Sequence, residues 1–302
     1  MQKKSGFVTI IGAPNAGKST LLNALIGENL SIVTSKPQTT RNRIFGILTE
    51  GNIQAVFVDI PGILEPKYRL QQYMASEIDD SFEEADLILV IYDTQKDSRG
   101  QLKKIVSKYG KSIGEKKSIL VLNKIDSIKK EDLLKMLSEV QLLFNFTEII
   151  PVSAKKKFNV VELKKVILNL IPEGEFFYGE DVITSQPEKF FVSEIIRKNL
   201  FRMMKEEVPF SVYVMINEFK ERDIGKDYIN ASVIVERESQ KSIIIGADGN
   251  RIKELGERSR KTIEGFLNRE VYLELFVKVS KNWKNDEEFL RKNVKQISKP
   301  LA

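Results

Sequence analysis

The chain has 302 residues, 42% hydrophobic and 30% charged, which is typical of a globular protein with two domains. It contains no cysteine and no histidine. This excludes disulfides, thiolate metal sites and histidine acid–base chemistry, and fits a reducing cytoplasm. The net charge of +6 is evenly divided, with 25 basic and 22 acidic residues in 1–180 and 23 and 20 in 181–302. Any nucleic-acid surface must therefore be a local patch.

The first six residues lead into a predicted strand at residues 7–11, without the apolar region of a signal peptide. No apolar run reaches the roughly 18 residues that a membrane span needs. A turn with the pattern G-x-x-x-x-G-K-S follows, and then an amphipathic helix begins. The backbone N–H groups of such a loop bind phosphate, with Lys18 near the β- and γ-phosphates and the Ser19 hydroxyl near Mg²⁺. The nucleotide-binding residues predicted here are Gly12, Ala13, Pro14, Asn15, Ala16, Gly17, Lys18, Ser19 and Thr20.

A polar loop at residues 27–42 precedes five further predicted strands, at residues 44–49, 53–58, 87–92, 119–122 and 149–152. Helical patterns lie between the later strands, at residues 70–84, 101–108, 130–143 and 160–170. The continuous apolar runs are typical of parallel strands that are covered on both faces. This alternation predicts a doubly wound α/β sheet with mainly parallel strands.

Three polar motifs follow predicted strands, at the sheet edge where open α/β sheets bind ligands. In Asp-Ile-Pro-Gly, Asp59 is placed to hold Mg²⁺ through water, and the Gly62 N–H to meet a γ-phosphate. In Asn-Lys-Ile-Asp, the carboxylate of Asp126 can accept from the ring N–H and the amino group of guanine together. Adenine offers no such pair, so this motif predicts selectivity for guanine. The third motif is Ser153-Ala154-Lys155.

These elements, in this order, resemble the signature of the translation-factor-class GTPases, which have a Ras-like P-loop NTPase fold. The resemblance implies that Ser19, Thr40 and Asp59 bind Mg²⁺, with the adjacent Thr39 as the alternative to Thr40. It also implies a GTP site that includes Asp59, Gly62, Asn123, Lys124, Asp126, Ser153, Ala154 and Lys155, with GDP as the product.

The chain departs from this family pattern where many GTPases carry a glutamine that orients water. Ile63 occupies that place, followed by Leu64. We therefore predict slow intrinsic hydrolysis that a partner or ordering of the loops accelerates. A further hypothesis is that Asn15 helps to recruit K⁺ beside the phosphates. The predicted catalytic residues are Lys18, Thr40, Gly62 and Asn15.

The second half divides into a linker and an α+β domain. The predicted boundaries are residues 1–172 for the GTPase domain, 173–187 for the linker and 188–302 for the second domain. The second domain is predicted to contain helices at 188–207 and 251–267 and strands at 210–219, 228–235 and 271–279.

The tetrapeptide Gly246-Ala-Asp-Gly249 lies between a short apolar segment and a basic helix. This arrangement resembles the type II KH domain, whose G-x-x-G loop contacts a single-stranded RNA backbone. Trp283 has two open interpretations, stacking on a base or sealing the core. The predicted RNA-binding residues are Ile245, Gly246, Ala247, Asp248, Gly249, Arg251, Lys253, Lys281 and Trp283.

A GTPase domain followed directly by a KH domain resembles the Era family of bacterial GTPases. The resemblance implies a monomeric cytoplasmic switch that binds 16S ribosomal RNA near its 3′ end during 30S subunit assembly. It also implies Mg²⁺ dependence and a loose peripheral association with the inner membrane. One alternative is a membrane or septum GTPase whose second domain binds protein or lipid. Another is a metabolic P-loop kinase, in which the Asn-Lys-Ile-Asp motif would be accidental.

Overall fold

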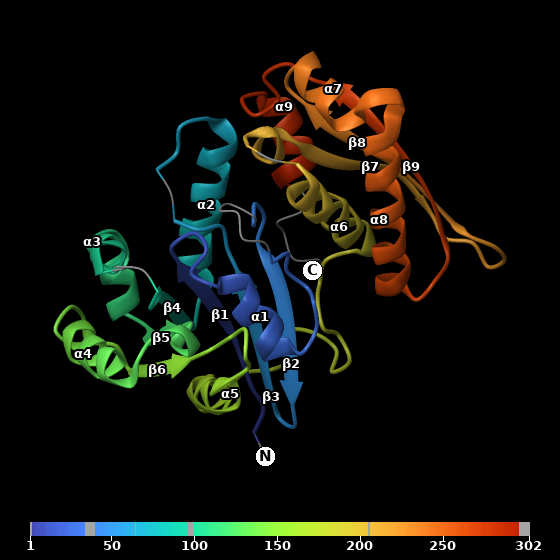
Figure 1. The fold of residues 1–302 in the computed structure, drawn as a ribbon. Coiled ribbons are helices and arrows are strands. Elements are labelled where there is room, and N and C mark those ends of the chain that lie inside the picture. The colour runs from blue at the N-terminus through green and yellow to red at the C-terminus, as the bar shows by residue number, and fades with distance from the viewer. Residues whose placement is uncertain (1, 34–39, 64, 96–98, 205, 296–302) are drawn as a thin grey trace. The chain divides into compact units, whose positions relative to one another are not determined.

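A computed structural model describes residues 2–33, 40–63, 65–95, 99–204 and 206–295. The chain forms two compact units (Figure 1). The first contains the residues up to Lys67 and Gln71–Ser185. The second contains Tyr68–Leu70 and the described residues from Gln186 to 295.

The first unit is built on a six-stranded sheet with the order β2-β3-β1-β4-β5-β6. Its strands are β1 (Lys4–Gly12), β2 (Ile44–Glu50), β3 (Ile53–Asp59), β4 (Leu87–Asp93), β5 (Lys117–Asn123) and β6 (Glu148–Val152). All neighbours pair in parallel except β2 and β3, which form a hairpin. The predicted doubly wound, mainly parallel sheet is thus confirmed. Because β1, β3, β4 and β5 run parallel, their carboxyl ends lie at one edge and bring the polar motifs there.

Helices cover both faces of this sheet. They are α1 (Lys18–Ile26), α2 (Arg69–Glu84), α3 (Arg99–Gly114), α4 (Lys130–Gln141) and α5 (Val160–Leu170). Helices α1 and α5 contact each other, whereas α2, α3 and α4 contribute to the core on the opposite face (Figure 1). Helix α3 extends beyond the predicted residues 101–108, because Tyr109 and Ile113 continue its buried stripe.

Residues 173–185, most of the predicted linker, lie against this sheet. Glu173 forms an antiparallel bridge with Lys4, and the Ile47 N–H donates to the Ile183 carbonyl at 2.9 Å. The buried Gln54 side chain donates to the Tyr178 carbonyl at 2.9 Å. These contacts attach residues 173–185 to the first unit.

The second unit has a three-stranded sheet with the order β7-β8-β9. Its elements are α6 (Glu188–Met203), β7 (Tyr213–Lys220), β8 (Asp227–Val235), α7 (Glu238–Ile245), α8 (Asn250–Leu267), β9 (Val271–Val279) and α9 (Glu287–Leu290). Strands β7 and β8 are antiparallel, and β8 and β9 are parallel. The α+β arrangement predicted for this domain is confirmed. Strand β7 begins later than predicted because Pro209 lies in a 3₁₀ turn.

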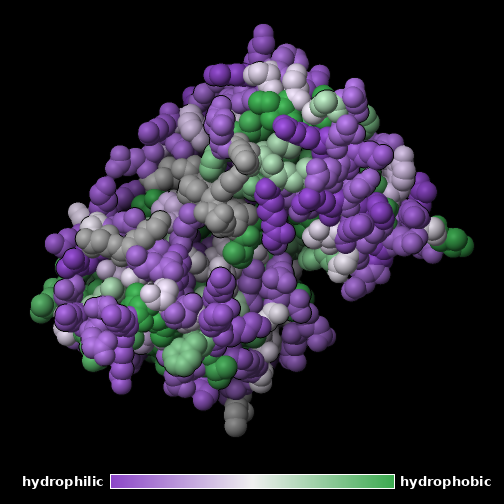
Figure 2. Space-filling model, in the orientation of Figure 1, coloured by the Kyte–Doolittle hydropathy of each residue, from purple (hydrophilic) through white to green (hydrophobic). Residues whose placement is uncertain are grey.

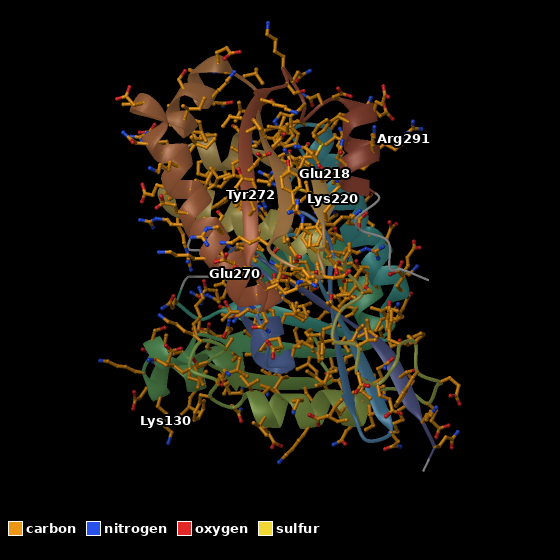
Figure 3. All side chains as sticks on the ribbon, turned by 90° about the vertical axis from the view of Figure 1, so that its right-hand side faces the viewer. Lys130, Glu218, Lys220, Glu270, Tyr272 and Arg291 are labelled. Carbon is orange, nitrogen blue, oxygen red and sulfur yellow. The ribbon has the colours of Figure 1, made fainter. Side chains whose placement is uncertain are left out.

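Helices α6, α7 and α8 pack on one face of this sheet through a shared core. Figure 3 looks onto the other face, where Glu218, Lys220 and Tyr272 project from the strands. The Tyr272 ring stacks on that of Tyr228, with ring centroids 6.1 Å apart.

Trp283 belongs to the core of the second unit. Its side chain is 0% exposed, its indole N–H donates to the Ser211 carbonyl at 3.2 Å, and its ring contacts Tyr213 and Phe289. A fully buried ring cannot stack on a base, so the RNA-binding interpretation of Trp283 is wrong.

No helix within the described ranges is long and apolar enough to cross a membrane. The face drawn in Figure 2 is mostly hydrophilic, with hydrophobic residues in scattered groups.

Candidate functional site

The loop between β1 and α1 is shaped by two residues with left-handed backbone, Asn15 and Gly17, at φ 65° and 101°. A Cβ atom at Gly17 would lie 2.2 Å from Nδ2 of Asn123, so only glycine fits. Lys18 is 7% exposed, and its Nζ donates to the carbonyls of Gly12 and Ala13, each at 3.2 Å. The loop therefore holds a buried cation whose present acceptors are two backbone carbonyls.

Hydroxyl groups converge on the buried carboxylate of Asp59 at the end of β3. Oδ2 of Asp59 accepts from Ser19 at 2.6 Å, from Ser31 at 2.8 Å and from Thr40 at 3.4 Å. Ser19 and Thr40 also share a hydrogen bond of 3.1 Å. Oδ1 of Asp59 is buried and has no partner within the described ranges. Three hydroxyl oxygens thus surround one oxygen of the Asp59 carboxylate, and the other carboxylate oxygen is an unsatisfied acceptor.

Burial dominates the electrostatics of this corner. It raises the pKa of Asp59 above its ordinary value, and the nearby Lys18 and the three hydroxyls oppose the rise only in part. Burial also lowers the pKa of Lys18, against the attraction of Asp59. Both charges are therefore costly without a further partner, as expected of groups that receive a metal ion and phosphate.

The donor set fits Mg²⁺, which prefers oxygen ligands and is held by one or two carboxylates together with substrate phosphates. The described ranges contain no group of three or more acidic, histidine or cysteine side chains that would form a metal cage. Ser19, Thr40 and Asp59 are the residues that would hold the ion. Ser31 is not among the predicted site residues, because nothing in the sequence distinguishes it from the other polar residues of its loop.

Asn123, at the end of β5, joins two loops that are distant in sequence. Its Nδ2 donates to the Ala16 carbonyl at 2.8 Å, and its Oδ1 accepts from the Ala154 N–H at 3.0 Å. Asn123 is 2% exposed. The predicted phosphate loop and the predicted base-pocket loop therefore meet at one buried amide.

Lys124 has a left-handed backbone, and its Nζ donates to the Asn15 carbonyl at 2.9 Å and to Oδ2 of Asp93 at 2.8 Å. Asp93 is 3% exposed at the end of β4. Asp93 is not among the predicted site residues, although its position directly after the apolar run at residues 87–92 is a visible signal. The contact positions the Lys124 stem.

The carboxylate of Asp126 is fixed by the hydroxyl of Ser153, which donates to its Oδ1 at 2.6 Å. Ser153 itself is 0% exposed, and Lys155 begins the exposed part of its loop. The structure therefore brings together the predicted motifs after β5 and β6, as a guanine pocket requires.

The Asp-Ile-Pro-Gly segment packs on the phosphate loop. A Cβ atom at Gly62 would come within 3.0 Å of Pro14, and the Ile63 N–H donates to the Gly12 carbonyl at 3.4 Å. The Ile63 side chain packs against the core, which explains why it presents no polar group. Thr39 and Leu64 lie outside the described residues.

The G-x-x-G loop of the second unit connects α7 and α8. Gly246 and Gly249 both have φ 74°, and Asp248 has φ 50°. The Arg251 side chain covers Gly246, and its Nη1 donates to the Ile243 carbonyl at 3.2 Å. One N–H group of Arg251 is therefore already bonded to the end of α7, whereas the side chains of Lys253 and Lys281 are exposed.

The fold and the site define a P-loop GTPase joined to a KH domain. Residues 7–124 match the family described as 50S ribosome-binding GTPase, and residues 207–284 match the KH domain. The chain is 43% identical to GTPase Era of Geotalea daltonii over 96% of its length and 97% of that protein. It is 44% identical to GTPase Era of Clostridium botulinum over 95% of its length and 97% of that protein. The chain belongs to the Era family of GTPases.

Two solved structures agree with this assignment. An Aquifex aeolicus Era variant bound to GDP·AlF₄⁻ superposes with a TM-score of 0.92, at 41% identity, over 96% of this chain and 99% of that one. Era in complex with MgGDPNP and nucleotides 1506–1542 of 16S ribosomal RNA also gives 0.92, at 41% identity, over 97% and 99%.

Proposed function

We propose that this GTPase binds 16S ribosomal RNA near its 3′ end in a nucleotide-dependent manner and assists assembly of the 30S subunit. One observation carries the proposal: a guanine pocket built on Asn123 and Asp126 shares a chain with a G-x-x-G loop. The RNA in the solved Era complex supports the choice of target. The proposed RNA contacts are Ile245, Gly246, Ala247, Asp248, Gly249, Arg251, Lys253 and Lys281.

In the proposed nucleotide site, Lys18 turns from the carbonyls of Gly12 and Ala13 to the β- and γ-phosphates. Bound Mg²⁺ supplies positive charge that offsets charge on the phosphates. Ser19, Thr40 and Asp59 are the proposed ligands, and the ion would give a partner to the buried Asp59 oxygen that has none within the described ranges. The remaining proposed nucleotide contacts are Pro14, Asn15, Ala16, Gly17, Thr20, Gly62, Lys124, Ser153, Ala154 and Lys155.

Hydrolysis in this proposal depends on positioning rather than on a side-chain base. Gly62 presents its N–H to the γ-phosphate, and Ile63 packs away from the site, so intrinsic turnover is slow. Asn15 contributes to a K⁺ position beside the phosphates. Replacement of K⁺ by Na⁺ should then slow single-turnover hydrolysis; equal rates would reject the K⁺ position while leaving the GTPase assignment intact.

Crosslinking to total cellular RNA, with GTP analogue or GDP, tests the function. The expected result is enrichment of the 3′ region of 16S ribosomal RNA with a clear preference for one nucleotide state. Gly249→Asp places a carboxylate where the RNA phosphate should lie and should abolish the enrichment. Uniform recovery of all RNA classes would contradict the RNA target, and equal recovery in both states would contradict the switch.

We place the protein in the cytoplasm, with a loose peripheral contact to the inner membrane as the finer proposal. The layout shared with the Era family supports it. Flotation with vesicles of inner-membrane lipids tests the membrane contact, which predicts partial, salt-sensitive co-migration.

A further inference from the structure

The geometry points to a second RNA-binding surface, on the GTPase domain itself: the hairpin of residues 153–158, whose tip presents three lysines and an exposed phenylalanine. The hairpin lies between β6 and α5 (Figure 1). The inference rests on the proposed RNA-binding function, since it adds a contact to the same class of partner.

The hairpin has a defined shape. Ser153 and Phe158 exchange two backbone hydrogen bonds, each of 3.1 Å, and the Lys156 N–H donates to the Ser153 hydroxyl at 3.2 Å. Lys157 and Asn159 take left-handed backbone conformations at φ 56° and 59°. A loop held in this way presents its tip at little further cost in conformational entropy when it binds.

The lysines at the tip differ from the neighbouring basic residues. Lys164 pairs with Glu50, and Lys165 with Glu162 at 3.6 Å. Lys155, Lys156 and Lys157 are exposed, and no acidic residue within the described ranges pairs with them. Three adjacent unpaired ammonium groups give a local positive surface that complements a phosphate backbone.

The aromatic residue also differs from its counterparts. Phe158 is 62% exposed and has no ring partner in the part of the chain that the structure describes. Phe177, at 51% exposed, packs on Phe7 with ring centroids 4.8 Å apart. An exposed ring beside unpaired lysines is the combination with which proteins stack on the bases of single-stranded nucleic acid.

A lipid surface fits this patch less well. Proteins bind a membrane surface through an amphipathic helix with its apolar face turned outward, or through clusters of about four to eight basic residues, more than the three at this tip. The apolar face of α5 is buried through Val160, Leu163 and Ile167, which leaves Phe158 and Val161 as the exposed apolar side chains beside the lysines. RNA uses both the charge and the ring.

The charge test compares Lys156→Gln/Lys157→Gln with Lys103→Gln/Lys104→Gln, a matched loss of two exposed lysines on α3. Affinity for purified 30S subunits is measured over a range of salt concentrations. If both lysines contact phosphates, the slope of log affinity against log salt falls by about 1.4 for the hairpin variant, at roughly 0.7 per contact. The α3 variant should keep the wild-type slope, and equal slopes for all three proteins would overturn the inference.

The ring test places photoreactive benzoylphenylalanine at Phe158 and, as a control, at Leu142, which is 89% exposed at the C-terminal end of α4. Irradiation with 30S subunits should crosslink the Phe158 position to ribosomal RNA and not the Leu142 position. Crosslinks to ribosomal protein, or to lipid when vesicles are present, would overturn the inference.

The two proposals fail in different ways. If wild-type protein binds 30S subunits and Gly249→Asp abolishes binding, while the hairpin variant matches wild type, only the second surface is rejected. If wild-type protein binds neither 30S subunits nor RNA, the proposed function itself fails, and this inference with it.

Discussion

The two glycine-framed loops of this chain solve a similar chemical problem in opposite ways. The phosphate loop is tied to distant segments, since Gly17 lies against Asn123 and the Asn15 carbonyl accepts from Lys124. The loop of the KH domain is closed by its own neighbours. The Gly246 N–H donates to the Ser242 carbonyl at 2.9 Å, and no atom of the described residues lies within 4 Å of a Cβ added at Gly249.

The two kinds of anchoring suit the different roles of the loops. A loop that meets base-reading residues through a buried amide couples phosphate and base recognition. The G-x-x-G loop is shaped by about ten consecutive residues, so its conformation depends on local contacts alone. Such a loop suits a contact with the RNA backbone that does not depend on base sequence. The effects of a substitution in the phosphate loop should therefore extend to distant residues, whereas those of a substitution in the KH loop should remain local.

The largest expected effect is that of Gly17→Ala. The added Cβ displaces either the loop or Asn123. Loss of two charge-assisted hydrogen bonds between the loop and the phosphates would weaken GTP binding by about 10²–10⁴-fold. Isothermal titration with a GTP analogue measures it. Gly27→Ala is the matched control, because Gly27 has φ 91° but no atom in the described part of the chain within 4 Å of an added Cβ. Equal losses of affinity would show that the collision with Asn123 is irrelevant.

Asp126→Asn tests the base-reading end of the same network. The amide cannot accept from both donors of guanine, so GTP affinity should fall by about 10²–10³-fold. Xanthine carries a carbonyl in place of the amino group, so affinity for xanthosine triphosphate should rise. Competition of both nucleotides, and of ATP, against labelled GDP measures the change. Unchanged preference for GTP would reject the assignment of Asp126.

Gly249→Ala probes the local character of the second loop. The φ of 74° costs an alanine about 1–2 kcal/mol, and the open space around the Cβ adds nothing. We expect 16S RNA affinity to fall about tenfold, with GTP affinity unchanged, in filter binding and titration. A large loss of GTP affinity would contradict the local character of this loop, because it would show that the substitution acts on the nucleotide site.

The smallest expected effect is a pH dependence of folding stability in the nucleotide-free protein, caused by the buried charges of the nucleotide site. Asp59 has a raised pKa, so the folded state binds its proton more tightly than the unfolded state does. Folding stability therefore rises as the pH falls through the native pKa of Asp59 and declines as the pH rises above the ordinary value of about 3.9.

Asp59→Asn removes this titration. The melting temperature of the variant relative to wild type should increase as the pH is raised from the ordinary aspartate value through the raised native pKa of Asp59, because only the wild type must then bury an ionised carboxylate. Saturating Mg²⁺ and GDP should reduce the difference, because they give the Asp59 charge a partner. Parallel melting curves over this range would contradict the burial of an unsatisfied charge.

Much of the fold could be predicted because the signals are local. Apolar runs identified the six strands of the first unit, and glycine and polar residues marked the loops that follow them. Predictions were less accurate where packing decides: Tyr109 and Ile113 extend α3 across the core, and Pro209 delays the start of β7. Trp283 had two interpretations in the sequence because burial is a property of the assembled core.

The sequence by itself determined the parallel sheet, the guanine-nucleotide motifs and the presence of a KH loop, because each depends on residue type and short spacing. The contacts between these motifs depend on the tertiary structure. The register of β4 beside β5 places Asp93 next to Lys124, and the approach of two loops makes Asn123 their common partner. Ser31 joins Asp59 for the same reason. Such contacts join residues from about thirty to over a hundred positions apart, and no local pattern in the chain records them.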